Sequence, residues 1–174
     1  KASVRLSDQR CAGHGCPTPT TFCYPGFGHT AEAVAALDEL GTLFARRGVR
    51  PEFADGGHGS RGPAYDPQVD HPLLIPTTGY DGPEWNLDDL KWAIEQARDG
   101  KICVLCFHGV PALEHPWVNT DPADFAKYVA YLKDEGCTVI AMRDLARYVD
   151  PTKRPADPYA PIQRRMEELQ KATP

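Results

Sequence analysis

The residue best suited to proton transfer in this sequence is His108, which directly follows an apolar segment at residues 101–107. If that segment is a strand, alternation places His108 on the same face as Val104 and Cys106. Active sites of parallel α/β proteins collect at the carboxyl ends of strands, where His108 would then lie. An imidazole titrates near neutrality and can protonate a leaving group. The alternative interpretation is a hydrogen-bonded histidine that only closes the strand.

The turn at residues 23–27, with the sequence Cys-Tyr-Pro-Gly-Phe, is a second candidate site. It follows a short apolar segment and precedes a helical pattern. Such turns direct backbone N–H groups outward, where they can stabilise a developing oxyanion. An ordinary Pro-Gly turn is the structural alternative.

Trp117, in the sequence His115-Pro116-Trp117, could present an aromatic platform to a sugar ring. Packing of Trp117 in the core or under a lid is the competing interpretation, and it applies equally to Tyr80 and Trp85.

Cysteine and histidine spacings give weaker signals. Cys103 and Cys106 have the spacing of a redox or zinc pair, but residues three apart on a strand face opposite sides. Cys11, His14 and Cys16 could form part of a zinc knuckle, yet a structural zinc needs four ligands. Polar residues of a loop could also bind metal, although solvated polarity explains them as well: Asp55, His58, Asp66, Asp70 and His71.

Composition excludes two broad classes of protein. The net charge of −5 provides no general basic field for a nucleic-acid backbone. The longest apolar run, at 102–107, is far shorter than the roughly 20 residues of a membrane-spanning helix. We therefore expect no nucleic-acid partner and no membrane span. The six cysteines are too few for a disulfide framework in 174 residues.

The elements that must position the candidate residues alternate between strand and helix. Short apolar segments predict strands at 20–24, 43–46, 73–75, 101–107 and 137–141. Spacing and capping residues predict helices that begin at Thr30, at Asn86 and at Thr120 or Asp121, with a short helix at 144–149. Residues 50–70, rich in Gly, Pro, Asp and His, are expected to form a long loop.

This alternation indicates a parallel α/β architecture, either an open sheet or part of a (β/α) barrel. We divide the chain into a polar lead-in at 1–19, an α/β domain at 20–150 and a Pro-rich tail at 151–174, which ends in a weakly amphipathic helix.

Two segments together resemble motifs of the polysaccharide deacetylases, the NodB-like carbohydrate esterases. The turn at 21–26 is similar to the third motif of that family in its Tyr-Pro-Gly form. Residues 105–109, Leu-Cys-Phe-His-Gly, resemble the closing motif, and residues 125–145 continue in the manner of the family. The resemblance extends over about residues 17–149.

The resemblance implies a distorted parallel (β/α) barrel that binds one divalent metal, usually zinc, and removes acetyl groups from N- or O-acetylated carbohydrate. His108 would be the general acid, and Gly26 would donate a backbone N–H to the oxyanion. Tyr24, Pro25, Phe27 and Trp117 would contact the substrate. Cys23 stands where the third motif commonly has an arginine.

Two further motifs of that family, Thr-Phe-Asp-Asp and His-Ser/Thr-x-x-His, do not occur in the sequence. They supply the catalytic base and the protein ligands of the metal, and they normally precede the third motif. The chain therefore resembles the C-terminal half of a deacetylase barrel, and we expect an N-terminal segment or partner chain to complete it and to carry most metal ligands. The alternatives are a non-catalytic carbohydrate-binding relative and a hydrolase of small non-sugar amides.

Overall fold

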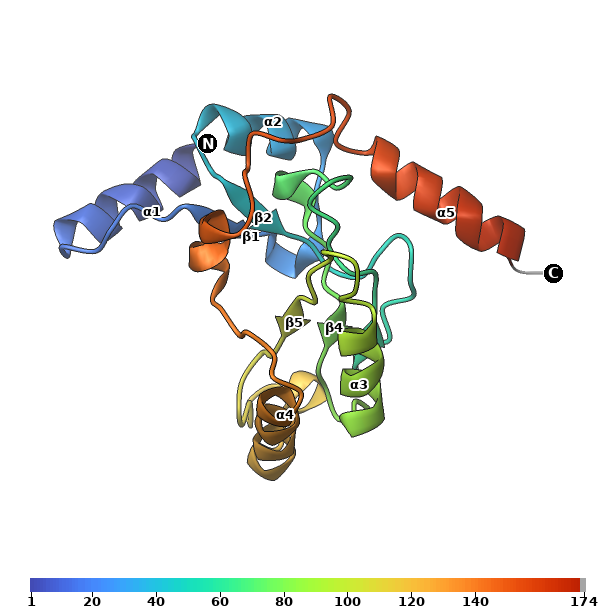
Figure 1. The fold of residues 1–174 in the computed structure, drawn as a ribbon. Helices are drawn as coiled ribbons and strands as arrows, with labels where there is room; N and C mark the ends of the chain where they lie inside the picture. Colours follow the sequence, from blue (N-terminus) through green and yellow to red (C-terminus); the bar gives the residue numbers. More distant parts are fainter. Residues whose placement is uncertain (173–174) are drawn as a thin grey trace.

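The computed structural model describes residues 1–172, and the order of their elements can be followed in Figure 1. The helices are α1 (Ala2–Gly13), α2 (Ala31–Glu39), α3 (Leu87–Glu95), α4 (Pro122–Asp134) and α5 (Ala160–Ala172). The strands are β1 (Thr21–Cys23), β2 (Phe44–Arg46), β3 (Ser60–Arg61), β4 (Gly79–Tyr80) and β5 (Leu105–Cys106). Short 3-10 helices lie at Pro25–Phe27, Pro72–Leu74, Pro116–Val118 and Met142–Arg147.

The strands form two small sheets that are linked by backbone hydrogen bonds. β1 pairs with β2 in parallel, and β4 pairs with β5 in parallel and with β3 antiparallel. Ile75 extends the first sheet, because its N–H donates to Ala45 O at 2.9 Å and its carbonyl accepts from Arg47 N at 2.8 Å. The same segment then continues into β4. Four segments, β1, β2, 75–80 and β5, therefore run in parallel, and their carboxyl ends point the same way.

The main helices begin where the sequence predicts. The Thr30 hydroxyl accepts from Ala33 N at the start of α2, and Asp121 caps α4. Asn86 and Asp89 form a reciprocal capping box at the start of α3. These local signals are satisfied by side chains within one turn, which is why they could be identified without knowledge of the fold.

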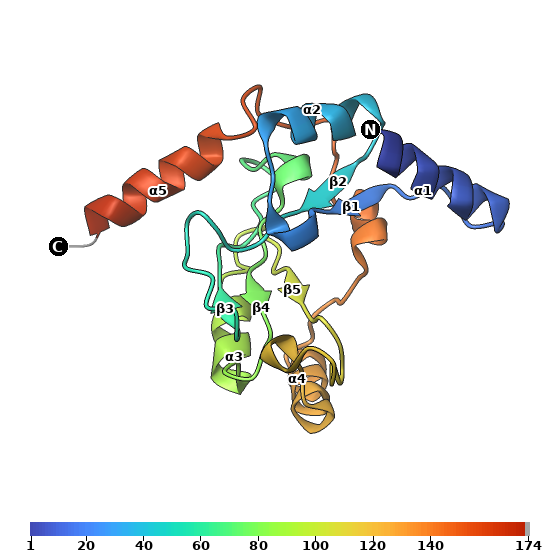
Figure 2. The same cartoon turned by 180° about the vertical axis from the view of Figure 1, so that it is seen from behind.

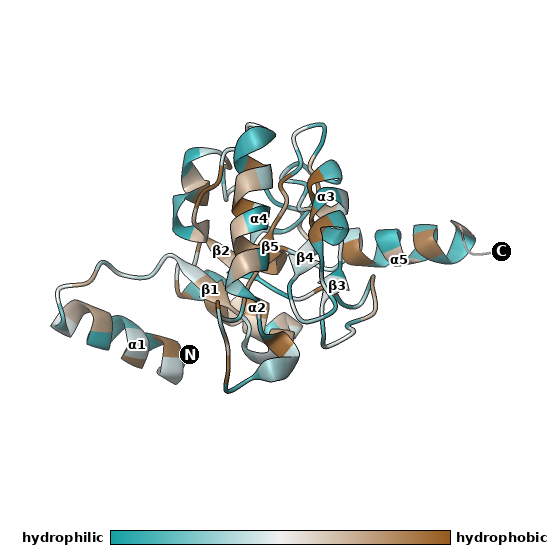
Figure 3. Ribbon diagram, turned by 90° about the horizontal axis from the view of Figure 1, so that it is seen from below, coloured by the Kyte–Doolittle hydropathy of each residue, from teal (hydrophilic) through white to brown (hydrophobic). Residues whose placement is uncertain are grey.

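The apolar core consists of three clusters of buried side chains, one of which is formed by Phe44, Tyr65, Ile75, Val104, Leu145 and Val149. Tyr24, Val34, Leu37 and Leu73 form a cluster that buries one face of α2. Figure 1 shows α2 at the top, above β1 and β2. Trp85, Leu90, Ala93 and Tyr128 join α3 to α4 beside β4 and β5 at the other end. In Figure 3 the brown, apolar colouring marks β1 and β5, whereas α1 and α5 show both apolar and polar colours. Both of these helices project from the body, as Figure 2 shows from behind.

Several sequence-based expectations are corrected by the structure. Residues 137–141 form no strand, and 73–75 lie mainly in a 3-10 turn between two prolines. Of the strand expected at 101–107, only Leu105–Cys106 forms a ladder. Its partner is β4, which is itself only two residues long. β3 lies inside the expected loop at 50–70.

The N-terminal region differs from expectation, whereas the helix expected at the end of the tail is present. The lead-in at 1–19 contains α1, which buries no residue of its own. The tail at 151–174 contains α5, which begins at Ala160 and is anchored by the buried Pro161 and Ile162.

The α/β class is confirmed for residues 1–172, which form small sheets covered by helices and no closed barrel. In the same residues no helix has both the length and the apolar character needed to cross a bilayer.

Candidate functional site

The carboxyl ends of the four parallel segments form an edge that we call the carboxyl edge, defined by Cys23, Arg46, Tyr80 and Cys106. The side chains on it come from segments far apart in the sequence. Arg46 contacts Cys23 across the first sheet, and the N–H of Asp81, which follows Tyr80, donates to Cys106 O at 3.0 Å. The edge is therefore continuous from β1 to β5.

His108 lies two residues beyond Cys106, and its side chain is exposed. Its ring packs edge-on against His115, with 5.0 Å between ring centroids, and His115 lies 5.2 Å from Trp117. Trp117 is 50 % exposed. The loop after β5 thus brings together three accessible rings, of which His108 is nearest the carboxyl edge in sequence.

The turn at Pro25–Phe27 follows β1 and reaches along the edge to Tyr80 of β4. Gly26 is exposed and adopts φ +58, a conformation that favours glycine. The Phe27 ring is packed against Tyr80, with centroids 5.4 Å apart. Gly48 makes this placement possible, because a Cβ at that position would lie 2.8 Å from Phe27. No hydrogen bond or ring contact within residues 1–172 joins this turn to His108.

Tyr24 is not available to a ligand. Its side chain is 2 % exposed, and its hydroxyl donates to Leu73 O at 2.9 Å. Burial raises its pKa well above the usual range. Tyr24 therefore belongs to the core beneath α2, and the expectation that it contacts substrate is corrected, whereas Pro25 is exposed and Phe27 half-buried.

Arg46 is a functional candidate that sequence reasoning missed. Nη2 of its guanidinium donates to Cys23 Sγ at 2.8 Å, and Nη1 donates to Thr77 Oγ1 at 2.9 Å. The guanidinium carbon lies 5.1 Å from the centroid of the Phe27 ring. An arginine from the neighbouring strand thus reaches the sulfur of Cys23. The available signal was the position of Arg46 at the end of a predicted strand.

Asp81 is the second residue that was missed. It is 3 % exposed, Oδ2 accepts from the Thr120 hydroxyl, and Oδ1 has no partner within residues 1–172. Burial raises the pKa of Asp81 to about 6. A pocket of about 240 Å³ adjoins this carboxyl. Its sequence signal was only a carboxylate before Gly82, six residues after the apolar segment at 73–75.

The cysteines of the strand face opposite sides, as alternation predicts. Cys103 packs toward the cluster that contains Trp85 and Leu90, and burial raises its pKa to about 12. Cys106 faces the carboxyl edge, where burial raises its pKa and the Arg46 guanidinium opposes that shift. All six cysteines are free.

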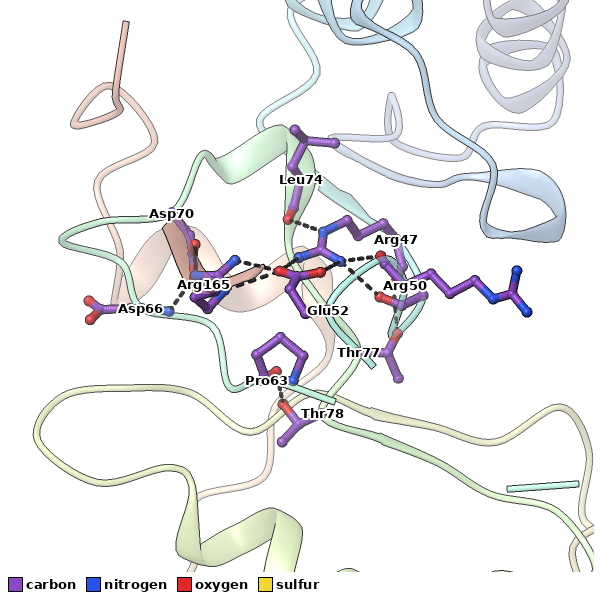
Figure 4. Close-up of polar contacts among 11 residues, drawn as sticks. Arg47, Arg50, Glu52, Pro63, Asp66, Asp70, Leu74, Thr77, Thr78 and Arg165 are labelled. Carbon is purple, nitrogen blue, oxygen red and sulfur yellow. Dashed lines mark hydrogen bonds and ion pairs between the residues drawn. The ribbon is translucent and has the colours of Figure 1, made fainter. Parts of the chain in front are cut away.

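Polar residues of the long loop serve mainly to hold α5 (Figure 4). Arg47 forms two hydrogen bonds to Glu52, at 2.6 and 2.9 Å, and both side chains are fully buried. Arg165 of α5 donates to Glu52 and also to Asp70 at 2.5 Å. We call Arg47, Glu52, Asp70 and Arg165 the charge network. His71 is likewise occupied, since Nδ1 accepts from Leu73 N.

Within residues 1–172, no three His, Cys, Asp or Glu side chains gather closely enough to hold a metal ion. These residues therefore do not themselves fit a zinc site. The comparisons with known proteins were equally without result: no family model, no curated protein and no solved structure matches this chain.

Proposed function

We propose that this chain contributes the acid and oxyanion groups of a hydrolase that removes acetyl groups from N- or O-acetylated carbohydrate. The observation that carries the proposal is the exposed imidazole of His108 two residues after β5, at the carboxyl edge of parallel segments. Catalytic groups of α/β proteins collect at that position.

The proposed chemistry assigns one task to each residue. His108 protonates the departing amine or alcohol, and the backbone N–H of Gly26 donates to the oxyanion that forms on the acetyl carbonyl. Trp117, together with Pro25 and Phe27, contacts the sugar beside these groups. A zinc ion bound by residues outside this chain would supply an activated water.

The arrangement proposed for the whole protein is a deacetylase-type (β/α) barrel completed by an N-terminal segment or a partner chain. An apolar groove of about 590 Å³ supports this proposal. It lies between β5, α4 and residues 137–140, where Val139 is 71 % exposed. An additional strand placed there would bury these side chains and pair with residues 137–141.

Replacement of His108 tests the catalytic assignment. In the full-length protein, His108→Ala should lower kcat on an N-acetylated chito-oligosaccharide about 10²–10⁴-fold, because the leaving group loses its proton donor. His14→Ala, which removes an exposed imidazole after α1, provides the matched control. An unchanged kcat in His108→Ala would reject the assignment.

A non-catalytic carbohydrate-binding protein is the second candidate. The sequence lacks the Thr-Phe-Asp-Asp and His-Ser/Thr-x-x-His motifs, and this observation favours it. Metal analysis of the full-length protein distinguishes the two functions. About one zinc per molecule together with acetate release supports the hydrolase, whereas saccharide binding without either supports the binding protein.

A further inference from the structure

The guanidinium of Arg46 is held in place by three chain segments. Cys23 of β1, Thr77 before β4 and the ring of Phe27 each contact it. The Thr77 hydroxyl donates to Arg47 O at 2.7 Å, so its oxygen is oriented to accept from Arg46. The guanidinium is therefore fixed at the carboxyl edge instead of extending into solvent.

Arg46 differs in its partners from the arginines of this structure that pair with a carboxylate. Arg47, Arg61, Arg154 and Arg165 each form an ion pair with a carboxylate. Within residues 1–172, no carboxylate lies within ion-pairing distance of Arg46. An arginine also has more N–H donors than its two hydrogen bonds use. A half-buried cation without a counter-ion has a poorly compensated charge, and an anionic ligand would compensate it.

The surroundings of Arg46 favour a ligand with one negative charge. A planar carboxylate matches the guanidinium fork. Burial is the main cause of the raised pKa of Tyr80 and of Cys106, and a nearby carboxylate adds to each shift, Asp55 at Tyr80 and Asp81 at Cys106. These acidic groups would repel a phosphate monoester, which carries nearly two charges, more strongly than a carboxylate.

We propose that Arg46 binds the carboxylate of a uronic acid unit, so that the saccharide recognised by this site is acidic as well as acetylated. This inference rests on the carbohydrate function proposed above and specifies its substrate class. Arg46 then selects the substrate, while His108 and Gly26 act on the acetyl group.

Two tetrasaccharides that differ only in their carboxyl groups test the proposal. The first alternates glucuronate with N-acetylglucosamine, and the second is the same molecule with its carboxyls reduced to alcohols. Calorimetric titration of the full-length protein should give an affinity for the acidic form about 10- to 100-fold higher. Arg46→Gln should lose this preference without weakening the neutral form, and Arg46→Lys should retain part of it.

Arg61→Gln is the matched control, because Arg61 also stacks on an aromatic ring, 4.9 Å from that of Trp92, but its guanidinium is paired with the carboxylate of Asp89. It should bind both tetrasaccharides as the wild type does. Equal affinity of the wild type for both tetrasaccharides would overturn the role of Arg46 and leave the carbohydrate function intact. Binding of neither would overturn both proposals. If Arg46→Gln fails to fold, the wild-type comparison still shows whether the acidic form is preferred, and a preference that Arg46→Lys leaves unchanged would overturn the role of Arg46.

Discussion

Asp81 illustrates how one buried carboxyl couples stability to pH. The folded chain removes it from water and leaves Oδ1 without a partner among residues 1–172, so the charged form is disfavoured. Its pKa is consequently raised from 3.8 to about 6. The contribution of Asp81 to the free energy of unfolding is therefore largest below its unfolded pKa, where the group is protonated in both the folded and the unfolded chain. This contribution is lost as pH rises through the folded pKa.

Asp81→Asn should remove that dependence. Relative to the wild type, the free energy of unfolding of the variant should increase by about 2–3 kcal/mol between pH 4 and pH 7, because the unfavourable charge is absent. Urea unfolding at both pH values measures the difference. Asp134→Asn, at an exposed carboxyl ending α4, should show no comparable change between the two pH values. A constant difference for Asp81→Asn would contradict the prediction.

At the scale of elements, the charge network joins α5 to the loop that follows β2. Figure 4 shows Glu52 between Arg47 and Arg165, with Asp70 on the outer side of Arg165. Glu52 is thus shared by two arginines, one fully buried and one 21 % exposed in its side chain. Removing the Glu52 carboxylate would leave the buried positive charge of Arg47 without a partner. This loss is much more costly than the loss of the partly exposed Arg165.

Glu52→Gln should therefore lower the free energy of unfolding by about 3–5 kcal/mol. Arg165→Gln should cost about 1–2 kcal/mol, since Glu52 keeps its bidentate contact with Arg47 and the buried Asp70 keeps its hydrogen bond from Asp66 N. Chemical denaturation of both variants measures these two losses of unfolding free energy. Hydrogen exchange should show that Arg165→Gln mainly increases exchange of the amides in α5. Equal losses in the two variants would show that the buried pair is not the dominant contact.

At the scale of the whole molecule, the apolar groove beside β5 exposes large apolar side chains to solvent. Val139 and Ile140 are exposed there, and residues 137–141 form no ladder in the part of the chain that the structure describes. Exposed apolar surface next to unpaired backbone promotes association between chains. This surface is where the proposed N-terminal segment or partner chain would dock.

The 174-residue chain on its own should consequently self-associate, with an average mass that rises with concentration in sedimentation equilibrium. Val139→Glu should reduce this association by placing a charge in the groove. Leu113→Glu is the control, because Leu113 is 79 % exposed but lies outside the groove. A cooperatively unfolding monomer with no tendency to associate would contradict the proposed barrel completion.

The sequence by itself determined the features that depend on neighbouring residues. Thr30, Asn86 and Asp121 cap helices through bonds to the next turn, so their positions could be read without the fold. The alternation of strand and helix likewise indicated the α/β class. His108 could be placed after a strand for the same reason, because its position follows from the segment directly before it.

Only the tertiary structure decided the features that depend on distant segments. Residues 137–141 have the composition of a strand but find no edge to pair with, and a strand needs such a partner to form its ladder. Tyr24 was placed in the core by Leu73, 49 residues away. The contacts of Arg46 with Cys23 and Thr77 arose in the same way, because sheet pairing brings together side chains whose spacing in the sequence carries no signal.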